Sequence, residues 1–431
     1  MQEEKTVLLN KLIYPKKVRH YNMSRKANKV TFFVKLLERL IVKILLKHQK
    51  YEIIKENMEL LDKKEPYLIL SNHMQFLDFE LLLKAVLPKG FHGIMNIEAY
   101  KMLPYWLIEW GGTIPKRKFT NDIAIVRSII RTSKTNDAIG LFPEARYTVT
   151  GELANLPDSL GKVIKLLNIP IVVFINHGNF LVKPVWGNGK NRKLPVRSNM
   201  KLILTKEQIA CLSIDEINKL IEKEMYYDEF VYQKESNILI KEDFRAEGLH
   251  KILYKCPHCG TEFEMSSYKT SLKCNHCNTA YFYNEDSSLT CENNTAIFTS
   301  IRDWLNYERE EAKKELLAGN YSFEGTFKAY SFPHPKYVIN LGDVFVKHSY
   351  DGFVFTGKYN GYDFCFKKSA LENYAIQTEY GSPSFNNKDL FALSTNDETI
   401  FFEPTNPQII HKLYYIVEEL YKIKDAERKK K

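Results

Sequence analysis

One segment constrains the fold of this chain more than any other: an apolar run that passes through a polar turn into a second apolar run. Residues 67–70 read Tyr-Leu-Ile-Leu and predict a strand, while residues 79–87 have the composition of a helix. The polar turn Ser-Asn-His at residues 71–73 separates them, and Asp78 stands where the helix would begin. The segment therefore predicts a strand–turn–helix unit of the kind that builds α/β sheets.

His73 and Asp78 are five positions apart, which would separate them by about 140° on a continuous helix. They can meet only if the turn stays non-helical, with His73 at the strand end and Asp78 at the helix N-terminus. There the carboxylate could accept a hydrogen bond from the imidazole N–H and stabilise the imidazolium, as a general base requires. The alternative is structural: Asp78 caps the helix, and His73 is an ordinary turn residue.

Three further segments follow this His-x4-Asp pair: Gly111-Gly112-Thr113-Ile114-Pro115-Lys116-Arg117, Phe142-Pro143-Glu144-Ala145-Arg146 and Ile169-Pro170-Ile171-Val172. Together the four segments resemble the ordered motifs of the glycerolipid acyltransferase family, whose best-known members are the 1-acylglycerol-3-phosphate acyltransferases. The resemblance covers roughly residues 28–235, half of the chain, and the intervals between the segments leave room for a helix and a return strand.

The third motif departs from the family pattern Phe-Pro-Glu-Gly-Thr/Ser-Arg. Ala145 stands in place of the glycine, and one residue is missing, so that Arg146 follows Glu144 by two positions instead of three. This spacing leaves the role of Arg146 open, although an acid and a guanidinium are both present.

The resemblance implies an O-acyltransferase that moves a fatty acyl group from acyl-CoA or acyl carrier protein to the hydroxyl of a lysophospholipid, above all 1-acylglycerol-3-phosphate, which would become phosphatidic acid. His73 would be the general base and Asp78 its orienting partner. The sequence has no Gly-x-Ser-x-Gly element and no cysteine near His73, which favours direct transfer over an acyl-enzyme. Two alternatives stay open: another lysolipid or glycolipid acceptor, and a nonenzymatic zinc-ribbon and lipid-binding adaptor.

A phosphate on the acceptor would need fixed cations, because guanidinium and ammonium groups bind phosphate oxygens. We expect Lys116, Arg117 and Arg146 to supply them, and the family resemblance makes Glu144 a ligand of the acceptor hydroxyl or an arginine-orienting group. The bland alternatives are a solvated basic loop for Lys116 and Arg117 and a helix cap for Glu144.

The net charge of +10 is concentrated at the N-terminal end of the chain, where residues 1–50 contain 13 basic side chains and three glutamates. Residues 30–46 have a wide apolar face and a narrow basic stripe, which predicts a helix lying in a membrane interface; a core helix is the alternative. The sequence contains no long uncharged apolar run and no secretory leader. We expect a cytoplasmic protein, peripheral on the inner face of the cell membrane, and do not expect it to bind nucleic acid.

Two Cys-x2-Cys pairs predict a zinc ribbon. Cys256 and Cys259 form the first pair, Cys274 and Cys277 the second, and 14 residues separate the pairs. Four thiolates would complete a tetrahedral Zn²⁺ site with no position for water, so the zinc would be structural. We expect no redox or nucleotide cofactor.

The C-terminal third changes to short β-type runs, with hairpin turns predicted at Asp351-Gly352 and Asn360-Gly361 and an amphipathic helix after Pro407. In outline this resembles the pleckstrin-homology-like superfold. The expected fold class is α/β, a mixed sheet flanked by helices, with an added zinc ribbon and a C-terminal antiparallel β domain that ends in a helix. The expected regions are a basic arm (1–27), an acyltransferase domain (28–235), the zinc ribbon and linkers (236–295), a helical connector (296–318) and the β-rich domain (319–431).

Overall fold

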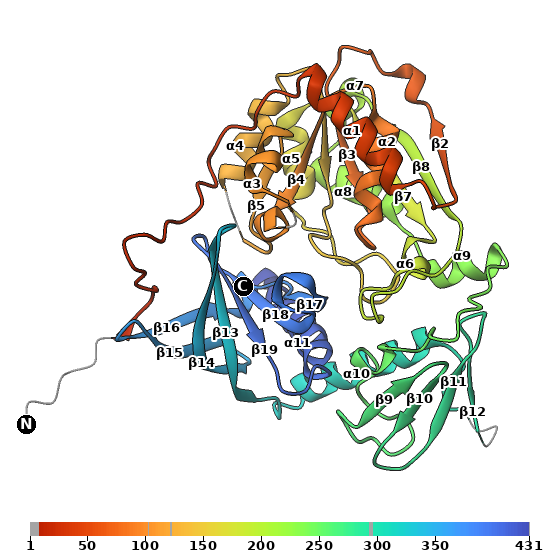
Figure 1. Ribbon diagram of the computed structural model, residues 1–431, viewed down its shortest axis with the longest axis vertical. Coiled ribbons are helices and arrows are strands. Elements are labelled where there is room, and N and C mark those ends of the chain that lie inside the picture. Colours follow the sequence, from red (N-terminus) through yellow and green to blue (C-terminus); the bar gives the residue numbers. More distant parts are fainter. Residues whose placement is uncertain (1–7, 102, 121–122, 293–295, 431) are drawn as a thin grey trace, which may run out of the picture. The chain divides into compact units, whose positions relative to one another are not determined.

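The computed structural model describes residues 8–101, 103–120, 123–292 and 296–430. The chain divides into two compact units (Figure 1). We call them the α/β unit, residues 22–116 and 122–242, and the β unit, the described parts of residues 1–21, 117–121 and 243–431. The first segment of the chain and the short stretch after Lys116 thus belong with the C-terminal half, a division that differs from the regions expected from the sequence.

The α/β unit contains a seven-stranded sheet in the order β2-β8-β7-β3-β6-β4-β5. Its neighbours run parallel except for β7 and β8, so the sheet is mixed, as predicted. The central strand β3 is buried along its whole length, which explains its continuous apolar sequence. The strands are β2 (Tyr51–Glu56), β3 (Tyr67–Ser71), β4 (Phe91–Asn96), β5 (Ile114–Lys116), β6 (Ala138–Leu141), β7 (Ile171–His177) and β8 (Val196–Leu204).

Helices flank this sheet (Figure 1). Helix α2 begins at Leu77, which leaves residues 72–76 outside any helix, as the His73–Asp78 spacing required. Because β3, β4, β5 and β6 are parallel, the segments that follow them emerge at the same edge of the sheet. The helices are α1 (Phe32–Leu45), α2 (Leu77–Val86), α3 (Tyr105–Trp110), α4 (Ile123–Thr132), α5 (Leu160–Leu167), α6 (Asn179–Val182), α7 (Lys206–Cys211), α8 (Ile214–Met225) and α9 (Glu229–Glu235), with 3₁₀ turns η1 (Met58–Leu60) and η2 (Ile97–Lys101).

The β unit contains an eight-stranded sheet in the order β1-β16-β15-β14-β13-β19-β18-β17. All neighbours are antiparallel except β1, which pairs in parallel with β16. The strands of this sheet are β1 (Leu8–Leu9), β13 (Phe323–His334), β14 (Tyr337–Ser349), β15 (Gly352–Tyr359), β16 (Tyr362–Ser369), β17 (Gln377–Ser382), β18 (Lys388–Ser394) and β19 (Thr399–Glu403). The unit also contains helices α10 (Ile301–Leu317) and α11 (Ile409–Lys430) and the 3₁₀ turns η3 (Leu249–Lys251), η4 (Ala370–Glu372) and η5 (Pro383–Phe385).

A small antiparallel sheet precedes α10 in the order β12-β11-β10-β9, formed by β9 (Met265–Tyr268), β10 (Ser271–Cys274), β11 (Ala280–Tyr283) and β12 (Leu289–Cys291). Helix α10 holds the backbone beside Cys256, the first cysteine of the predicted ribbon. The Trp304 indole N–H donates to the Lys255 carbonyl at 2.8 Å, and Glu308 accepts the Lys255 N–H at 2.7 Å. Helix α10 in turn contacts α11, since Arg309 pairs with Glu418 and Glu419. The ribbon is therefore an integral part of the β unit.

Residues 8–21 pack against the C-terminal part of the β unit. Beyond the β1–β16 pairing, Leu12 and Tyr21 are buried, and the Tyr14 hydroxyl donates to the carboxylate of Glu398. This part of the expected basic arm therefore contributes to a folded core. No helix among the described residues is long and apolar enough to cross a membrane.

Candidate active site

His73 lies in the turn after β3, and Asp78 lies in the first turn of α2. His73 Nδ1 is 3.2 Å from Asp78 Oδ2, and the same oxygen accepts the backbone N–H groups of Met74 and Gln75. The other carboxylate oxygen, Oδ1, accepts the side-chain amide of Asn179. The Asp78 side chain is fully buried, whereas the imidazole is 19% exposed. A fixed carboxylate thus orients an imidazole that a substrate can reach.

Two aromatic rings set the plane of the imidazole. The His73 ring stacks on Phe142 with centroids 4.1 Å apart and an interplanar angle of 25°, and Tyr147 lies 4.3 Å away at a tilt of 51°. Phe142 is the first residue of the third motif and directly follows β6, the neighbour of β3. With the proton on Nδ1, the lone pair lies on Nε2, which is the arrangement of a general base.

Glu144 contacts the backbone of His73. Its carboxylate accepts the His73 N–H at 3.1 Å, the Ala154 N–H at 3.0 Å and the Tyr227 hydroxyl at 3.1 Å. Burial raises the pKa of Glu144 to about 7 against the opposing effect of these hydrogen bonds and of Arg146. Glu144 is only 2% exposed, and its observed contacts hold the turn that carries His73; a contact with an acceptor hydroxyl stays a prediction.

Of the two residues after Glu144, Ala145 is partly exposed and Arg146 is buried. Ala145 has a φ of 58°, in the left-handed region, and its N–H donates to the Phe142 carbonyl at 3.0 Å. Glycine adopts this conformation without the strain that a Cβ atom causes. Arg146 is 3% exposed and lies close enough to influence Glu144. Its side chain is therefore buried near the Glu144 carboxylate.

Lys116 and Arg117 are adjacent in sequence but belong to different units. Lys116 ends β5 in register with Asn96 and is partly buried. Arg117 is 1% exposed within the β unit, where its guanidinium donates to the carbonyl oxygens of Phe332, Pro333 and Asp397. The structure therefore groups Arg117 with the β unit, and the acceptor-binding role expected for it stays a prediction.

Residues 52–175 match the family model for Acyltransferase. The matched acyltransferase region contains both members of the His73–Asp78 pair and the third motif. The chain is similar in structure, over 45% of its length, to the crystal structure of the 1-acyl-sn-glycerophosphate (LPA) acyltransferase PlsC from Thermotoga maritima, of which 75% is covered; the sequence identity is 16% and the TM-score is 0.35. No curated protein matches this chain.

Several polar residues of the site escaped the sequence analysis. Asn179 follows β7 and reaches Asp78, and Tyr227 reaches Glu144 from the loop before α9. Asn72 joins β3 to β7, since its side chain exchanges hydrogen bonds with the Asn176 backbone at 2.9 Å in both directions. Asn72 lies in the turn beside His73, but its sequence gave no sign of its partner 104 positions away. Asn179 and Tyr227 gave no local signal, although the polar sequence after the apolar strand at Ile171 could have indicated a strand end.

The four cysteines of the predicted ribbon converge, and all four sulfur atoms lie within 4.8 Å of one another. Cys256 Sγ is 3.7 Å from Cys277 Sγ, and Cys259 Sγ is 3.8 Å from Cys274 Sγ. A tetrahedron with Zn–S bonds of about 2.3 Å has edges of about 3.8 Å, whereas a disulfide is about 2 Å long. The donor set therefore fits a metal held by four thiolates.

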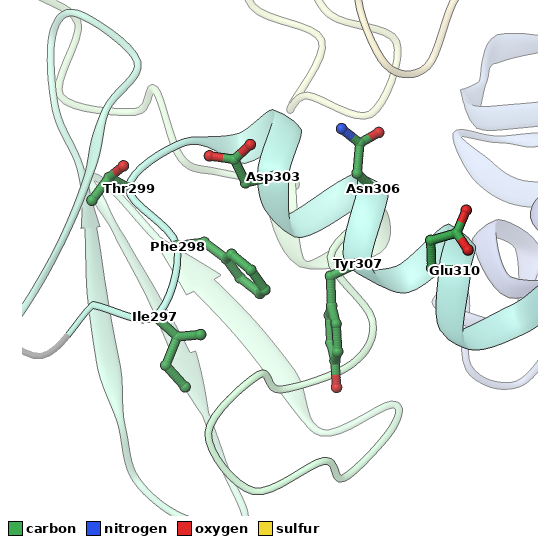
Figure 2. A pocket seen from close by; sticks show the side chains of 7 residues that line it. All are labelled: Ile297, Phe298, Thr299, Asp303, Asn306, Tyr307 and Glu310. Atoms are coloured by element: carbon green, nitrogen blue, oxygen red, sulfur yellow. The ribbon is translucent and has the colours of Figure 1, made fainter. Parts of the chain in front are cut away.

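One surface cavity, of about 460 Å³, lies in the β unit beside the start of α10 (Figure 2). Asp303, Asn306, Tyr307 and Glu310 project from α10, and residues 297–299 form the other side. Its lining contains no histidine, lysine or arginine and so offers neither an imidazole base nor a cation for phosphate. We therefore assign the candidate chemistry to the turn after β3.

Proposed function

We propose that this protein is an acyltransferase that transfers a fatty acyl group from acyl-CoA or acyl carrier protein to the hydroxyl of a lysophospholipid, with 1-acylglycerol-3-phosphate as the leading acceptor. The observation that carries the proposal is the 3.2 Å contact between His73 Nδ1 and the buried Asp78 carboxylate, within a region that matches the Acyltransferase family. Another lysolipid or a glycolipid acceptor is compatible with the same chemistry.

In the proposed reaction His73 Nε2 takes the proton of the acceptor hydroxyl while that oxygen attacks the thioester carbonyl. Asp78 stabilises the imidazolium that forms, because its carboxylate faces Nδ1. The C–O bond forms, the tetrahedral intermediate collapses, and the C–S bond breaks. The departing thiolate then receives the proton from Nε2, which returns the imidazole to its starting state.

The reaction is tested by incubating purified protein with radiolabelled acyl-CoA or acyl carrier protein and a panel of lysolipids. We expect His73→Ala to abolish turnover and Asp78→Asn to lower it by about 10²-fold or more, as loss of a base and of its orienting group does. His48→Ala, at an exposed histidine of the same unit, is the control and should retain activity. Label transfer by His73→Ala at the wild-type rate would remove His73 from the mechanism.

The acceptor panel also tests the phosphate assignment. Of the two expected phosphate-binding cations in the α/β unit, Lys116 is partly exposed and Arg146 is buried. If the acceptor phosphate contacts Lys116, then Lys116→Ala raises the KM for 1-acylglycerol-3-phosphate more than the KM for a phosphate-free acceptor. Activity confined to phosphate-free acceptors would contradict the assignment and favour a glycolipid acceptor.

We propose that α1 binds the protein to the inner face of the cell membrane. The apolar side chains of Phe33, Leu36, Leu40 and Ile44 recur at helical spacing, and each is more than half exposed. Val34 and Val42 face the protein interior instead. An apolar row of this kind, flanked by basic residues, suits a helix lying in a bilayer interface.

Vesicle flotation tests this proposal with point variants, because deletion of the N-terminal segment would also remove β1 and Tyr14 from the β unit. Leu36→Glu with Leu40→Glu should abolish flotation with vesicles that contain anionic phospholipid. Leu317→Glu changes an equally exposed leucine at the end of α10 and should float as wild type does. Unchanged flotation of the double variant would contradict the role of α1.

A further inference from the structure

The turn after β7 is joined to the catalytic turn by side-chain contacts on both sides. Asn179 is the first residue of α6. Its backbone carbonyl accepts a hydrogen bond from the Gln75 side-chain amide at 2.8 Å, and its side-chain amide donates to Asp78 Oδ1. The N–H of the next residue, Phe180, points to the sulfur of Met74 at 3.3 Å. Asn179 lies beyond residues 52–175, the stretch that matches the family model.

The two carboxylate oxygens of Asp78 accept different numbers of hydrogen bonds. Oδ2 accepts from His73 and from two backbone N–H groups, whereas within the described part of the chain Oδ1 accepts only from the Asn179 amide. Both Asp78 and Asn179 have no solvent-exposed surface, so water cannot replace the amide without rearrangement. The Asn179 donor is therefore the contact on which the Oδ1 side of the carboxylate depends.

Loss of that donor has a predictable effect on the pair. A buried carboxylate oxygen without a donor costs free energy, which the group can relieve by rotating or by taking up a proton. Rotation would move Oδ2 away from His73, and protonation would remove the charge that stabilises the imidazolium. Both outcomes weaken the base without changing any group that touches a substrate.

We infer that Asn179 is a positioning residue for the acyl transfer, an inference that rests on the function proposed above. Its amide fixes the Asp78 carboxylate, and Asp78 in turn fixes the tautomer and orientation of His73. The amide must present its NH₂ group, because a carboxylate can only accept. Asparagine supplies that donor without adding a charge beside Asp78.

Steady-state kinetics separate this role from substrate binding. We expect Asn179→Ala to lower kcat by about 10- to 100-fold, part of the range that acid–base catalysis spans, with KM for donor and acceptor changed by less than about twofold. Asn218→Ala is the control, because the partly exposed Asn218 side chain also makes two hydrogen bonds with the backbone, at Gly161 and Asp158, but none with Asp78. A kcat within twofold of wild type for Asn179→Ala would overturn the inference.

Two further variants distinguish positioning from a general loss of packing. Asn179→Asp keeps the shape of the side chain but places a second carboxyl group beside Asp78. When this carboxyl group is protonated it can again donate a hydrogen bond to Asp78, so the kcat of the variant relative to wild type should rise as the pH falls. In the Asp78→Asn background, Asn179→Ala should lower the residual kcat by less than about twofold, because its effect passes through Asp78. A pH-independent ratio, or effects that multiply fully in the double variant, would contradict the inference.

An NMR measurement keeps the inference testable apart from turnover. In protein labelled with ¹⁵N-histidine, a downfield Nδ1 proton of His73 should be present in the wild type and absent in both Asp78→Asn and Asn179→Ala, while thermal unfolding shows each variant to be folded. Persistence of that signal in Asn179→Ala would overturn the positioning role. Loss of the signal in a protein that transfers no acyl group would instead support the positioning role and contradict only the proposed function.

Discussion

Ala145 occupies a backbone conformation that an L-residue with a side chain rarely adopts, with a φ of 58°. Left-handed backbone costs a non-glycine residue about 1 kcal/mol, and glycine removes that cost. We predict that Ala145→Gly raises the free energy of unfolding by up to about 1 kcal/mol while activity stays close to wild type. Denaturant unfolding measures this; a destabilised variant would show that the alanine methyl group makes a packing contribution larger than the strain.

The raised pKa of Glu144 makes one contribution to stability depend on pH. Its folded pKa of about 7 lies above the ordinary value of 4.5, so the folded protein binds the proton more tightly than the unfolded chain. The stability that protonated Glu144 contributes is therefore fully present below pH 4.5 and is lost as the pH rises to about 7. Relative to wild type, Glu144→Gln should gain up to about 3 kcal/mol of unfolding free energy across this window. A difference in unfolding free energy between Glu144→Gln and wild type that does not vary with pH would contradict the raised pKa of Glu144.

At the scale of elements, the sequence predicted the structures that form between residues close together in the chain. The strand–turn–helix unit from Tyr67 and the mixed α/β sheet are confirmed, as is the two-residue turn at Asn360-Gly361, where both residues have positive φ. The first hairpin differs by one position: Gly352 pairs with Ser349, so the turn consists of residues 350–351. A glycine with a φ of 116° sits inside the ladder there, which a dipeptide pattern cannot distinguish from a turn position.

The contacts that the sequence could not reveal join distant elements. Arg117 follows a motif strand and was expected beside an acceptor phosphate, yet its carbonyl acceptors stand 215 to 280 positions later. Asn179 and Asp78 are 101 positions apart and gave no spacing signal. Periodicity reports the face of an element, whereas these pairings depend on which elements the topology brings together.

At the scale of the whole molecule, the β unit is assembled from segments that are distant in sequence, and the cysteine cluster lies where several of them meet. The backbone of Lys255, next to Cys256, is held by Trp304 and Glu308 of α10. The ribbon also contacts α11, because the Lys412 ammonium lies 2.8 Å from the Glu262 carboxylate. The cysteine cluster is therefore linked by direct contacts to helices outside the ribbon.

We accordingly predict that the four thiolates bind a zinc ion and that its removal unfolds more than the ribbon. Folding free energy in such sites comes largely from the metal, so Cys256→Ser or a strong chelator should release about one zinc per chain and expose α10 and α11 to hydrogen exchange. Cys365→Ser changes a cysteine of β16 outside the cluster and should leave metal content and exchange unchanged. Because the His73–Asp78 pair belongs to the other unit, its Nδ1 proton signal should persist in Cys256→Ser. Metal loss with unchanged exchange in both helices would show that the packing of Trp304 and Glu308 against Lys255 survives without the ion.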